Sequence, residues 1–345
     1  MSMGGAQDQL TIESPPIDGV SAVHFSPVSS NHLLVSSWDS QVRLYHLADN
    51  SLKSVFQHRA AVLGCAFEPG GQYAYSGGLD TWVRRLDLNT EKIRVLGTHT
   101  AGVSSVVHSQ ELNALITGSW DRSVKLWDPR QGNPKSLISS HEQPERVYAM
   151  DIVKNTLVVA TAGRRVQIYD TRNMAAPAQE RVSSLKFGTS SLACMPDGSG
   201  FAMGSVEGRV SVEFFEETPE VQARKYAFKC HRQVTPEGDV VYPVNALAFH
   251  PIYGTFASGG SDGRVAVWDH FSKKRLRQYP AFPAGVSALA FSAEGTKMAI
   301  GASYSWDVPD QRRREELKER GDEMETISIV VRDVGEETKP KTGNA

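Results

Sequence analysis

The sequence is poor in cysteine and in long apolar runs. Its three cysteines, Cys65, Cys194 and Cys230, lie far apart and form no CxxC pair. This argues against a disulfide framework or a structural zinc site and indicates a reducing compartment, cytosol or nucleus. No apolar stretch approaches the roughly 20 residues that cross a bilayer, and the start MSMGGAQDQ lacks the basic and apolar segments of a signal peptide. We therefore expect a soluble intracellular protein.

Net charge and catalytic motifs are also scarce. The formal net charge of −2 provides no overall field to attract nucleic acid or an anionic membrane, so any phosphate binding has to come from a local cluster. The sequence contains no GxSxG elbow, no phosphate-cradling GxxxxGK and no HExxH. We expect a protein that is not an enzyme and that holds no metal and no cofactor.

What the sequence does contain is a motif repeated at a fixed interval. Asp39, Asp80 and Asp121 are each 41 residues apart, and each lies in a similar stretch: SWDSQVRLY, GLDTWVRRL and SWDRSVKLW, with SDGRVAVW further on. The interval matches the roughly 40–45 residues of a four-stranded propeller blade. The 29 glycines and the short apolar runs fit many tight turns between short strands.

Seven such blades can be traced, which predicts an all-β fold, a seven-bladed WD-repeat β-propeller. We expect one domain at residues 9–334, with Leu10–Ile12 supplying the missing outer strand of the last blade and closing the ring. The tails, 1–8 and 335–345, are expected to be disordered. In the fourth blade the turn reads AGRRV, and we place Arg164 where other blades carry the aspartate.

The third blade has the spacing of a buried hydrogen-bond chain made by His99, Thr117, Asp121 and Trp127. A histidine, a hydroxyl and a carboxylate also suggest a hydrolase. However, the same set recurs in part at His58, Ser76 and Asp80 in the second blade, and a catalytic site does not repeat from blade to blade. The structural interpretation is favoured, because buried polar groups are normally hydrogen-bonded.

Two segments depart from the repeat. Glu216–Tyr242 reads as a long connection that contains QARKYAFKCHR, and long loops on a repeat scaffold are often functional. Trp306–Glu325 contains QRRREELKER, which favours a short charged helix inserted in the last blade, although such a run is usually a solvated face.

These segments complete a resemblance to the spindle-assembly-checkpoint family of WD-repeat adaptors, the third-named of the Bub group. The similar stretches cover nearly all of residues 10–335 and include PPIDGVSAVHFSP, GSWDRSVKLWDPR, TAGRRVQIYDTRNM, EGRVSVEFF, YAFKCHR and YPVNALAFHP. AGRRV and YAFKCHR are not required by the repeat, so their joint presence is specific. The resemblance implies a non-catalytic adaptor of nuclear and kinetochore location.

The resemblance also implies a peptide site on one rim of the propeller for the GLEBS segment of a Bub-type checkpoint kinase or its Mad-type relative. Trp38 and Trp120, in the SWD turns, would pack against that peptide as rigid aromatic anchors; the alternative is that they only cap their turns. The family's arginine after the SSLKY box is replaced here by Ser190 and its neighbours. The charge would have to come from Arg164, Arg165 or Arg181.

A second implied site reads phosphothreonine in MELT repeats of a kinetochore scaffold. Arg209 in EGRV and Lys229 in YAFKCHR match the phosphate contacts, and a phosphate between two cations forms charge-assisted hydrogen bonds. The alternatives are a surface arginine on a turn and a lysine paired with Glu207. The resemblance implies a monomeric propeller in heterocomplexes, including the mitotic checkpoint complex, without direct contact to DNA or membrane.

A related family remains as the alternative. The WD-repeat factor of messenger RNA export shares EGRV, the FKCHR box and the AFHP-type sixth blade, but its first blade and AGRRV segment differ from this sequence. Under that alternative, the rim would bind a nucleoporin GLEBS segment and the basic patch would bind single-stranded RNA.

Overall fold

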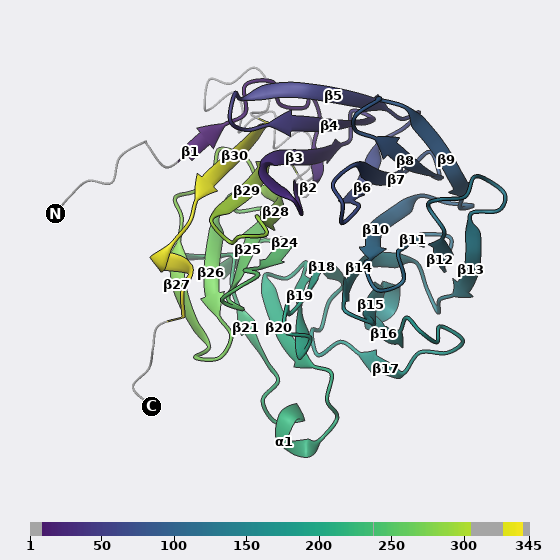
Figure 1. Cartoon of the computed structure of the whole chain (residues 1–345). Helices are drawn as coiled ribbons and strands as arrows, with labels where there is room; N and C mark the ends of the chain where they lie inside the picture. The colour runs from purple at the N-terminus through teal and green to yellow at the C-terminus, as the bar shows by residue number, and fades with distance from the viewer. Residues whose placement is uncertain (1–8, 237, 305–326, 341–345) are drawn as a thin grey trace.

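Seven four-stranded antiparallel sheets form a closed ring around a central cavity of about 430 Å³ (Figure 1). The computed structural model describes residues 9–236, 238–304 and 327–340. The predicted seven-bladed all-β propeller is confirmed. In the described ranges, no helix is long and apolar enough to span a membrane. The predicted helix in the 306–325 insertion lies outside the described residues.

Each of the first four blades follows the chain from its inner strand to its outer strand. Blade one consists of β2 (Val20–Ser26), β3 (Ser29–Ser37), β4 (Gln41–His46) and β5 (Ser51–Gln57). Blade two consists of β6 (Val62–Phe67), β7 (Tyr73–Gly78), β8 (Trp82–Asp87) and β9 (Ile93–Thr98). Blade three consists of β10 (Val103–Ser109), β11 (Ala114–Ser119), β12 (Ser123–Trp127) and β13 (Leu137–Glu142). Blade four consists of β14 (Val147–Val153), β15 (Thr156–Thr161), β16 (Arg165–Asp170) and β17 (Gln179–Val182), with a 3-10 turn η1 (Ala162–Arg164).

The remaining blades carry the insertions. Blade five consists of β18 (Thr189–Cys194), β19 (Gly200–Ser205), β20 (Arg209–Phe214) and β21 (Tyr226–Lys229), with the short helix α1 (Pro219–Gln222) before its last strand. A hairpin of β22 (Arg232–Thr235) and β23 (Gly238–Val241) precedes blade six, which consists of β24 (Val244–Phe249), β25 (Phe256–Gly260), β26 (Val265–Asp269) and β27 (Lys274–Gln278). Blade seven consists of β28 (Val286–Phe291), β29 (Lys297–Ala302), β30 (Ser328–Asp333) and β1 (Gln9–Thr11), followed by the 3-10 turn η2 (Glu336–Thr338).

Glycines on the second strand of a blade let the next blade approach closely. A Cβ atom added to Gly118 would come within 2.7 Å of the side chain of Val147 in the following blade. Gly301 has the same relation to Val20, at 2.8 Å, so blade seven packs on blade one as the other blades pack on their neighbours. Such interlocking between sheets divides the hydrophobic core into layers between the blades.

The N-terminal strand closes the ring as predicted. β1 pairs antiparallel with β30, and Leu10 lies opposite Val331. The N–H of Ile12 donates to the carbonyl of Ile329 at 2.9 Å, and the Ile12 side chain is buried. In Figure 1 the purple N-terminal strand lies beside the yellow C-terminal one, so the edge of β30 is paired and β1 becomes the outer strand of blade seven.

The chain of polar residues in blade three has the geometry that its spacing predicts. His99 contacts Asp121 through Nδ1 at 2.9 Å and Thr117 through Nε2 at 2.8 Å, and the indole of Trp127 donates to the Thr117 hydroxyl at 2.8 Å. Blade six contains a second complete chain that sequence reasoning missed, made by four residues: His231, Ser258, Asp262 and Trp268. In blades three and six, these chains fasten the turn aspartate and the loop before the first strand to the second strand.

Part of the predicted long connection belongs to a blade. Tyr226–Lys229 forms the outer strand of blade five, so the interpretation of Glu216–Tyr242 as one connection is wrong for these residues. The reason is their alternation: Tyr226 and Phe228 pack inward, and the Phe228 ring centroid lies 4.6 Å from that of Trp268 in blade six.

The C-terminal boundary also differs from the prediction. Residues 335–340 do not belong to a tail without structure, because η2 packs between blades six and seven. Thr338 is fully buried, and its carbonyl accepts a hydrogen bond from the Thr255 hydroxyl at 2.7 Å. This short polar segment is therefore ordered by its contacts with the blades, which its composition alone does not predict.

Candidate functional site

One end of the propeller carries a row of apolar side chains at equivalent places in successive blades. Trp38, Leu79 and Trp120 each stand directly before the turn aspartate of blades one, two and three. Their backbone N–H groups make the same hydrogen bond to the segment before the inner strand; that of Trp38 donates to Gly19 at 2.8 Å and that of Trp120 to Gly102 at 2.9 Å. The repeat therefore fixes the backbone position of these three residues, and the residue type decides how much apolar surface each side chain exposes.

The two predicted tryptophans differ in how much surface they offer. Trp38 is 41% exposed. Trp120 is half-buried, because it packs over Gly102, where an added Cβ would lie 3.1 Å from the indole and 3.0 Å from Leu79. Glycine at this place lets the ring lie flat on the backbone, which gives a broad apolar surface with little side-chain entropy to lose.

Sequence reasoning missed further exposed apolar residues at this end of the blades, namely Tyr148, Phe187 and Val206. Val206 precedes Glu207 in the same turn position as the tryptophans. Val206 could have been found from the sequence, because it directly precedes the turn carboxylate of its blade as Trp38 and Trp120 do in theirs. We call Trp38, Leu79, Trp120, Tyr148, Phe187 and Val206 the apolar row.

The two predicted arginines of this rim are placed differently. Arg164 lies at the rim, with φ of 63° and its guanidinium donating to the Leu185 carbonyl at 3.2 Å. The register corrects its assignment: Arg164 corresponds to Arg122, which has φ of 64°, and Gly163 stands where other blades carry aspartate. In blade three the left-handed residue stands one position after the aspartate, and Arg164 takes that position in AGRRV. The residue that corresponds to the aspartate is therefore the one before Arg164.

Arg181 does not face the rim. It lies on β17, where its guanidinium approaches Glu213 of blade five at 3.6 Å and donates to the Phe215 carbonyl at 3.2 Å. Its side chain is largely buried. The structure therefore places Arg181 in the contact between blades four and five and not with the tryptophans.

Arg209 and Lys229 are brought together. They are directly opposite each other in the pairing of β20 with β21, so both side chains lie on the same face of blade five. Arg209 is held near Glu207, with Nε 3.5 Å from a carboxylate oxygen, while Lys229 is exposed. Like charges directly opposite each other on a sheet are destabilising, which points to an anion as their common partner.

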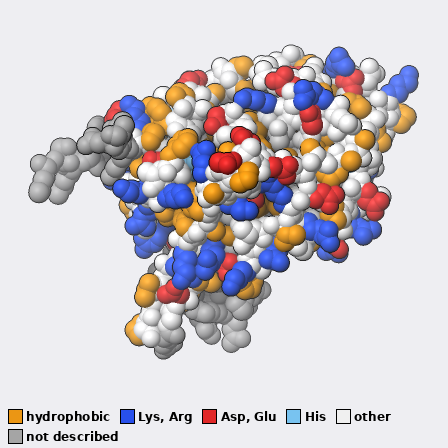
Figure 2. Space-filling view, turned by 90° about the horizontal axis from the view of Figure 1, so that it is seen from below, with side chains coloured by type: hydrophobic (Ala, Val, Ile, Leu, Met, Phe, Trp, Pro, Cys, Tyr) orange, Lys and Arg blue, Asp and Glu red, His pale blue; other side chains and the backbone are white. Residues whose placement is uncertain are grey.

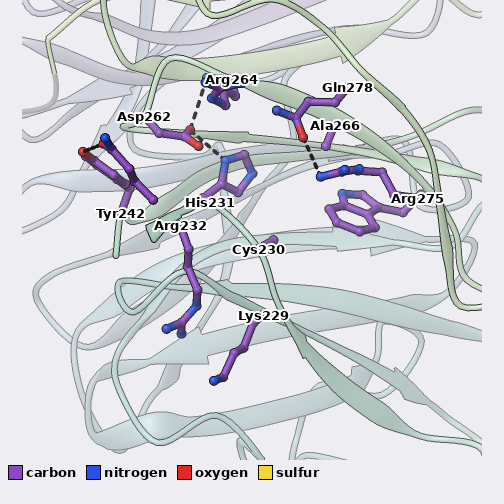
Figure 3. Close-up of a pocket in the computed structure, with 12 residues that line it drawn as sticks. Lys229, Cys230, His231, Arg232, Tyr242, Asp262, Arg264, Ala266, Arg275 and Gln278 are labelled. Carbon is purple, nitrogen blue, oxygen red and sulfur yellow. Dashed lines mark hydrogen bonds and ion pairs between the residues drawn. The ribbon is translucent and has the colours of Figure 1, made fainter. Parts of the chain in front are cut away.

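A third cation, which sequence reasoning missed, joins this pair from the β22–β23 hairpin. Arg232 donates to the Glu207 carbonyl at 3.0 Å and lies 3.6 Å from Asp239. Figure 3 shows Lys229 and Arg232 extending in the same direction from a pocket of about 440 Å³. Beyond them, Arg264 and Arg275 also line this pocket.

The only carboxylate lining this pocket in the described part of the chain, that of Asp262, is hydrogen-bonded to His231 at 2.8 Å. The surface shows the same bias: in Figure 2, Lys and Arg side chains gather in one area of this side of the molecule, whereas elsewhere in the view both signs are interspersed. The pocket is therefore positive although the whole chain is nearly neutral.

The histidine chains are not accessible to a substrate. The side chains of His99 and Asp121 are 0% and 5% exposed. Burial lowers the pKa of His99, although Asp121 acts to raise it; burial acts to raise the pKa of Asp121, but hydrogen bonds from His99 and Ser123 outweigh it and hold that pKa well below its usual range. Among the described residues, no three His, Cys, Asp or Glu side chains are grouped to hold a metal.

This fold and its turn motifs define a WD-repeat propeller, a non-catalytic binding scaffold. The family model "WD domain, G-beta repeat" matches residues 10–46, 50–85, 90–128 and 228–269. Mitotic checkpoint protein BUB3.1 of Arabidopsis thaliana is 49% identical and covers 96% of this chain and 94% of its own length. Mitotic checkpoint protein bub3 of Dictyostelium discoideum is 42% identical over 85% of this chain and 88% of its own length. The chain belongs to the Bub3 family of mitotic checkpoint proteins.

Two further similarities set the limits of this assignment. A Poly(A)+ RNA export protein of Schizosaccharomyces pombe is 36% identical over 88% of this chain and 86% of its own length. The solved structure titled "Structure of U3-55K" superimposes with a TM-score of 0.78 at 15% identity, covering 95% of this chain and 99% of that one. The second similarity shows the fold alone.

Proposed function

We propose that the chain is an adaptor of the spindle assembly checkpoint that binds two peptides at one end of its propeller. The apolar row takes the GLEBS segment of a Bub-type kinase or its Mad-type relative, and Arg209 with Lys229 takes a phosphothreonine of the MELT repeats. Binding both at once recruits the kinase to unattached kinetochores of the dividing nucleus. The propeller acts as a monomer within such complexes, with no direct contact to DNA or membrane.

The observation that carries the phosphopeptide site is the direct opposition of Arg209 and Lys229 on β20 and β21. A phosphate carries close to two negative charges and three acceptor oxygens at neutral pH, so it satisfies two facing cations at once. Arg232, whose guanidinium is anchored on the Glu207 carbonyl at 3.0 Å, adds positive potential without having to move.

The apolar row supports the second peptide. Trp38 and Trp120 offer rigid aromatic surface of the kind that dominates binding energy in peptide complexes. Arg164, fixed at the rim by the Leu185 carbonyl, and the exposed Arg165 are the cations available to acidic residues of that peptide. Ser190 donates its hydroxyl to the Val244 carbonyl at 2.7 Å, so it stabilises the inner strands and leaves the charge to these arginines.

The test is a titration of the purified chain with a MELT-type peptide, unphosphorylated and threonine-phosphorylated, at physiological salt. We expect binding only to the phosphorylated form, and loss of it in the double variant Arg209→Ala, Lys229→Ala, with binding of a GLEBS peptide unchanged. Equal binding to both peptides, or to neither, overturns the phosphopeptide assignment.

A second candidate function is that of the export factor. The similarity to an RNA export protein and the cations around the 440 Å³ pocket favour it. It predicts binding of single-stranded RNA that falls steeply with salt and does not depend on threonine phosphorylation. The same double variant, titrated with an RNA oligonucleotide, distinguishes the two functions.

A further inference from the structure

Arginine stands at one and the same place in blades four, five and six. Arg165, Arg209 and Arg264 each directly follow the left-handed residue of their turn, whose φ is 63° in blades four and five and 70° in blade six. In the first three blades this place is held by uncharged residues: Gln41, Trp82 and Ser123. The proposed function uses Arg165 and Arg209 to bind anionic groups of peptides and leaves Arg264 without a role.

A small residue leaves space for a pocket beside Arg264. In blade two, the residue four positions after the turn aspartate is Arg84, which is buried and pairs with Asp80 at 2.7 Å. In blade six, the residue four positions after Asp262 is Ala266, and it lines the pocket of about 440 Å³. Alanine leaves unfilled the place that a guanidinium occupies in blade two, which gives room for the side chain of a ligand.

The two arginines that blade six contributes to this pocket, Arg264 and Arg275, have no carboxylate partner. Both are exposed, and neither forms an ion pair within residues 9–236, 238–304 and 327–340. Arg275 donates to the neutral side-chain oxygen of Gln278. The carboxylate of Asp262 contacts Nδ1 of His231 at 2.8 Å and accepts from the backbone N–H of Arg264 at 3.2 Å. Cations without a carboxylate partner beside a pocket point to an anionic ligand.

We propose that this pocket binds an acidic side chain of the peptide whose phosphothreonine lies at Arg209 and Lys229, an inference that rests on the proposed function. Lys229 also lines the pocket, and Figure 3 shows it on one side with Arg264 and Arg275 on the other. Neighbouring sheets lie about 10 Å apart and an extended chain advances about 3.3 Å per residue, so the acidic residue stands about three to five residues from the phosphothreonine. A carboxylate fits better than a second phosphate, because its single charge is repelled less by Asp262 and by the first phosphate. Its two oxygens match the fork of a guanidinium.

The experiment titrates the full chain with threonine-phosphorylated MELT-type peptides by fluorescence anisotropy at physiological salt. The parent peptide carries glutamine at all flanking positions, and each of the others carries one glutamate about three to five residues before or after the phosphothreonine. We expect glutamate at one of these positions to raise the affinity about fivefold over glutamine. That gain should fall below about twofold in Arg264→Gln and decrease in Arg275→Gln. Arg277→Gln is the matched control and should keep the gain, because Arg277 is an exposed arginine of the same strand, β27, that does not line the pocket.

Failure of the proposed function and failure of the pocket give different results. If the parent phosphopeptide does not bind, the phosphothreonine site is overturned and the pocket assignment with it. If the parent binds but no glutamate raises its affinity, only the pocket assignment is overturned. The same holds if the gain persists in both Arg264→Gln and Arg275→Gln, or if Arg277→Gln loses it equally. Thermal melts separate folding from binding, and Arg264→Gln is expected to melt as the unaltered chain does, because Arg264 is exposed.

Discussion

Arg209 and Lys229 face each other across β20 and β21, so two positive side chains share one face of blade five. Glu207 lies beside Arg209, with Nε 3.5 Å from its carboxylate, and the exposed Lys229 forms no ion pair within the described residues. Under the proposed function, this arrangement gives up some stability for a site that binds an anion. Removing one of the two cations should therefore lower the affinity for an anionic peptide without lowering the stability of the fold.

Replacing Lys229 with glutamine tests this expectation. We expect the affinity for a threonine-phosphorylated MELT peptide to fall about tenfold or more, since a charge-assisted hydrogen bond contributes roughly 1.5–3 kcal/mol. The melting temperature should not fall, because repulsion between like charges is removed. Titration calorimetry and a thermal melt measure both, with Lys225→Gln as control because Lys225 is an exposed lysine of the preceding loop. Equal affinities in the two variants would contradict the site.

Trp38→Ala tests the apolar row. We expect the affinity for a GLEBS peptide to fall by about 2 kcal/mol, roughly thirtyfold, as for an aromatic anchor, with little change in stability because the ring is 41% exposed. Phe271→Ala is the control, since Phe271 is 61% exposed in the turn after β26, at the opposite end of the blades. A Trp38 variant that binds as the Phe271 variant does would exclude Trp38 from the site.

Asp121→Asn tests the buried polar chain. Asp121 accepts hydrogen bonds from His99 and from the backbone N–H of Thr100, both at 2.9 Å, and we expect the free energy of unfolding to fall by about 2–3 kcal/mol. Asp128→Asn, which breaks only the exposed pair with Arg130, should cost at most about 0.5 kcal/mol. Denaturant titration of both variants at pH 7 measures the difference.

His108 predicts a pH dependence of stability. Burial lowers its pKa from the ordinary 6.5 to about 4, and its ring stacks on Tyr75 with centroids 5.5 Å apart. Between pH 6.5 and 4 the unfolded chain binds a proton that the folded chain does not, so the free energy of unfolding falls as pH is lowered from 7 to 5. His108→Phe should reduce that fall by about 1–2 kcal/mol and leave the curves parallel above pH 7. Parallel curves over the whole range would be the contrary result.

Truncation tests the C-terminal segment. Removing residues 335–345 takes away the buried Thr338 and its hydrogen bond from Thr255, and we expect a loss of about 1–3 kcal/mol of stability. Removing only residues 341–345 leaves that contact intact and should change stability by less than about 0.5 kcal/mol. Thermal melts of the two truncated chains make the comparison. A longer truncation that melts like the shorter one would show that the segment does not stabilise the ring.

Local pattern was enough for much of the fold. The 41-residue spacing of Asp39, Asp80 and Asp121 predicted the blades, and the apolar Leu10 next to a blade short of one strand predicted ring closure. The hydrogen-bond chain from His99 to Trp127 was also readable, because its members have fixed offsets within one blade. Such features depend on residues close together in sequence and on strand pairing, and the spacing and type of the residues are enough to predict them.

Other features were decided only where blades meet. Arg181 looked like a rim cation, but its strand places it against Glu213 of the next blade. Residues 335–345 looked like a disordered tail, but Thr338 is buried and its backbone carbonyl accepts a hydrogen bond from the Thr255 hydroxyl. The place of the turn aspartate in blade four belongs to Gly163 and not to Arg164, because the pairing of β15 with β16 sets the register of the turn.

By itself, the sequence determined the propeller, its closure and the residue types available for binding. Only the tertiary structure decided that Arg209 and Lys229 share one face and that Arg232 joins them from a hairpin. The physical reason is that electrostatic repulsion, burial and hydrogen bonding depend on distances between residues far apart in the chain, and those distances exist only once the blades have packed together.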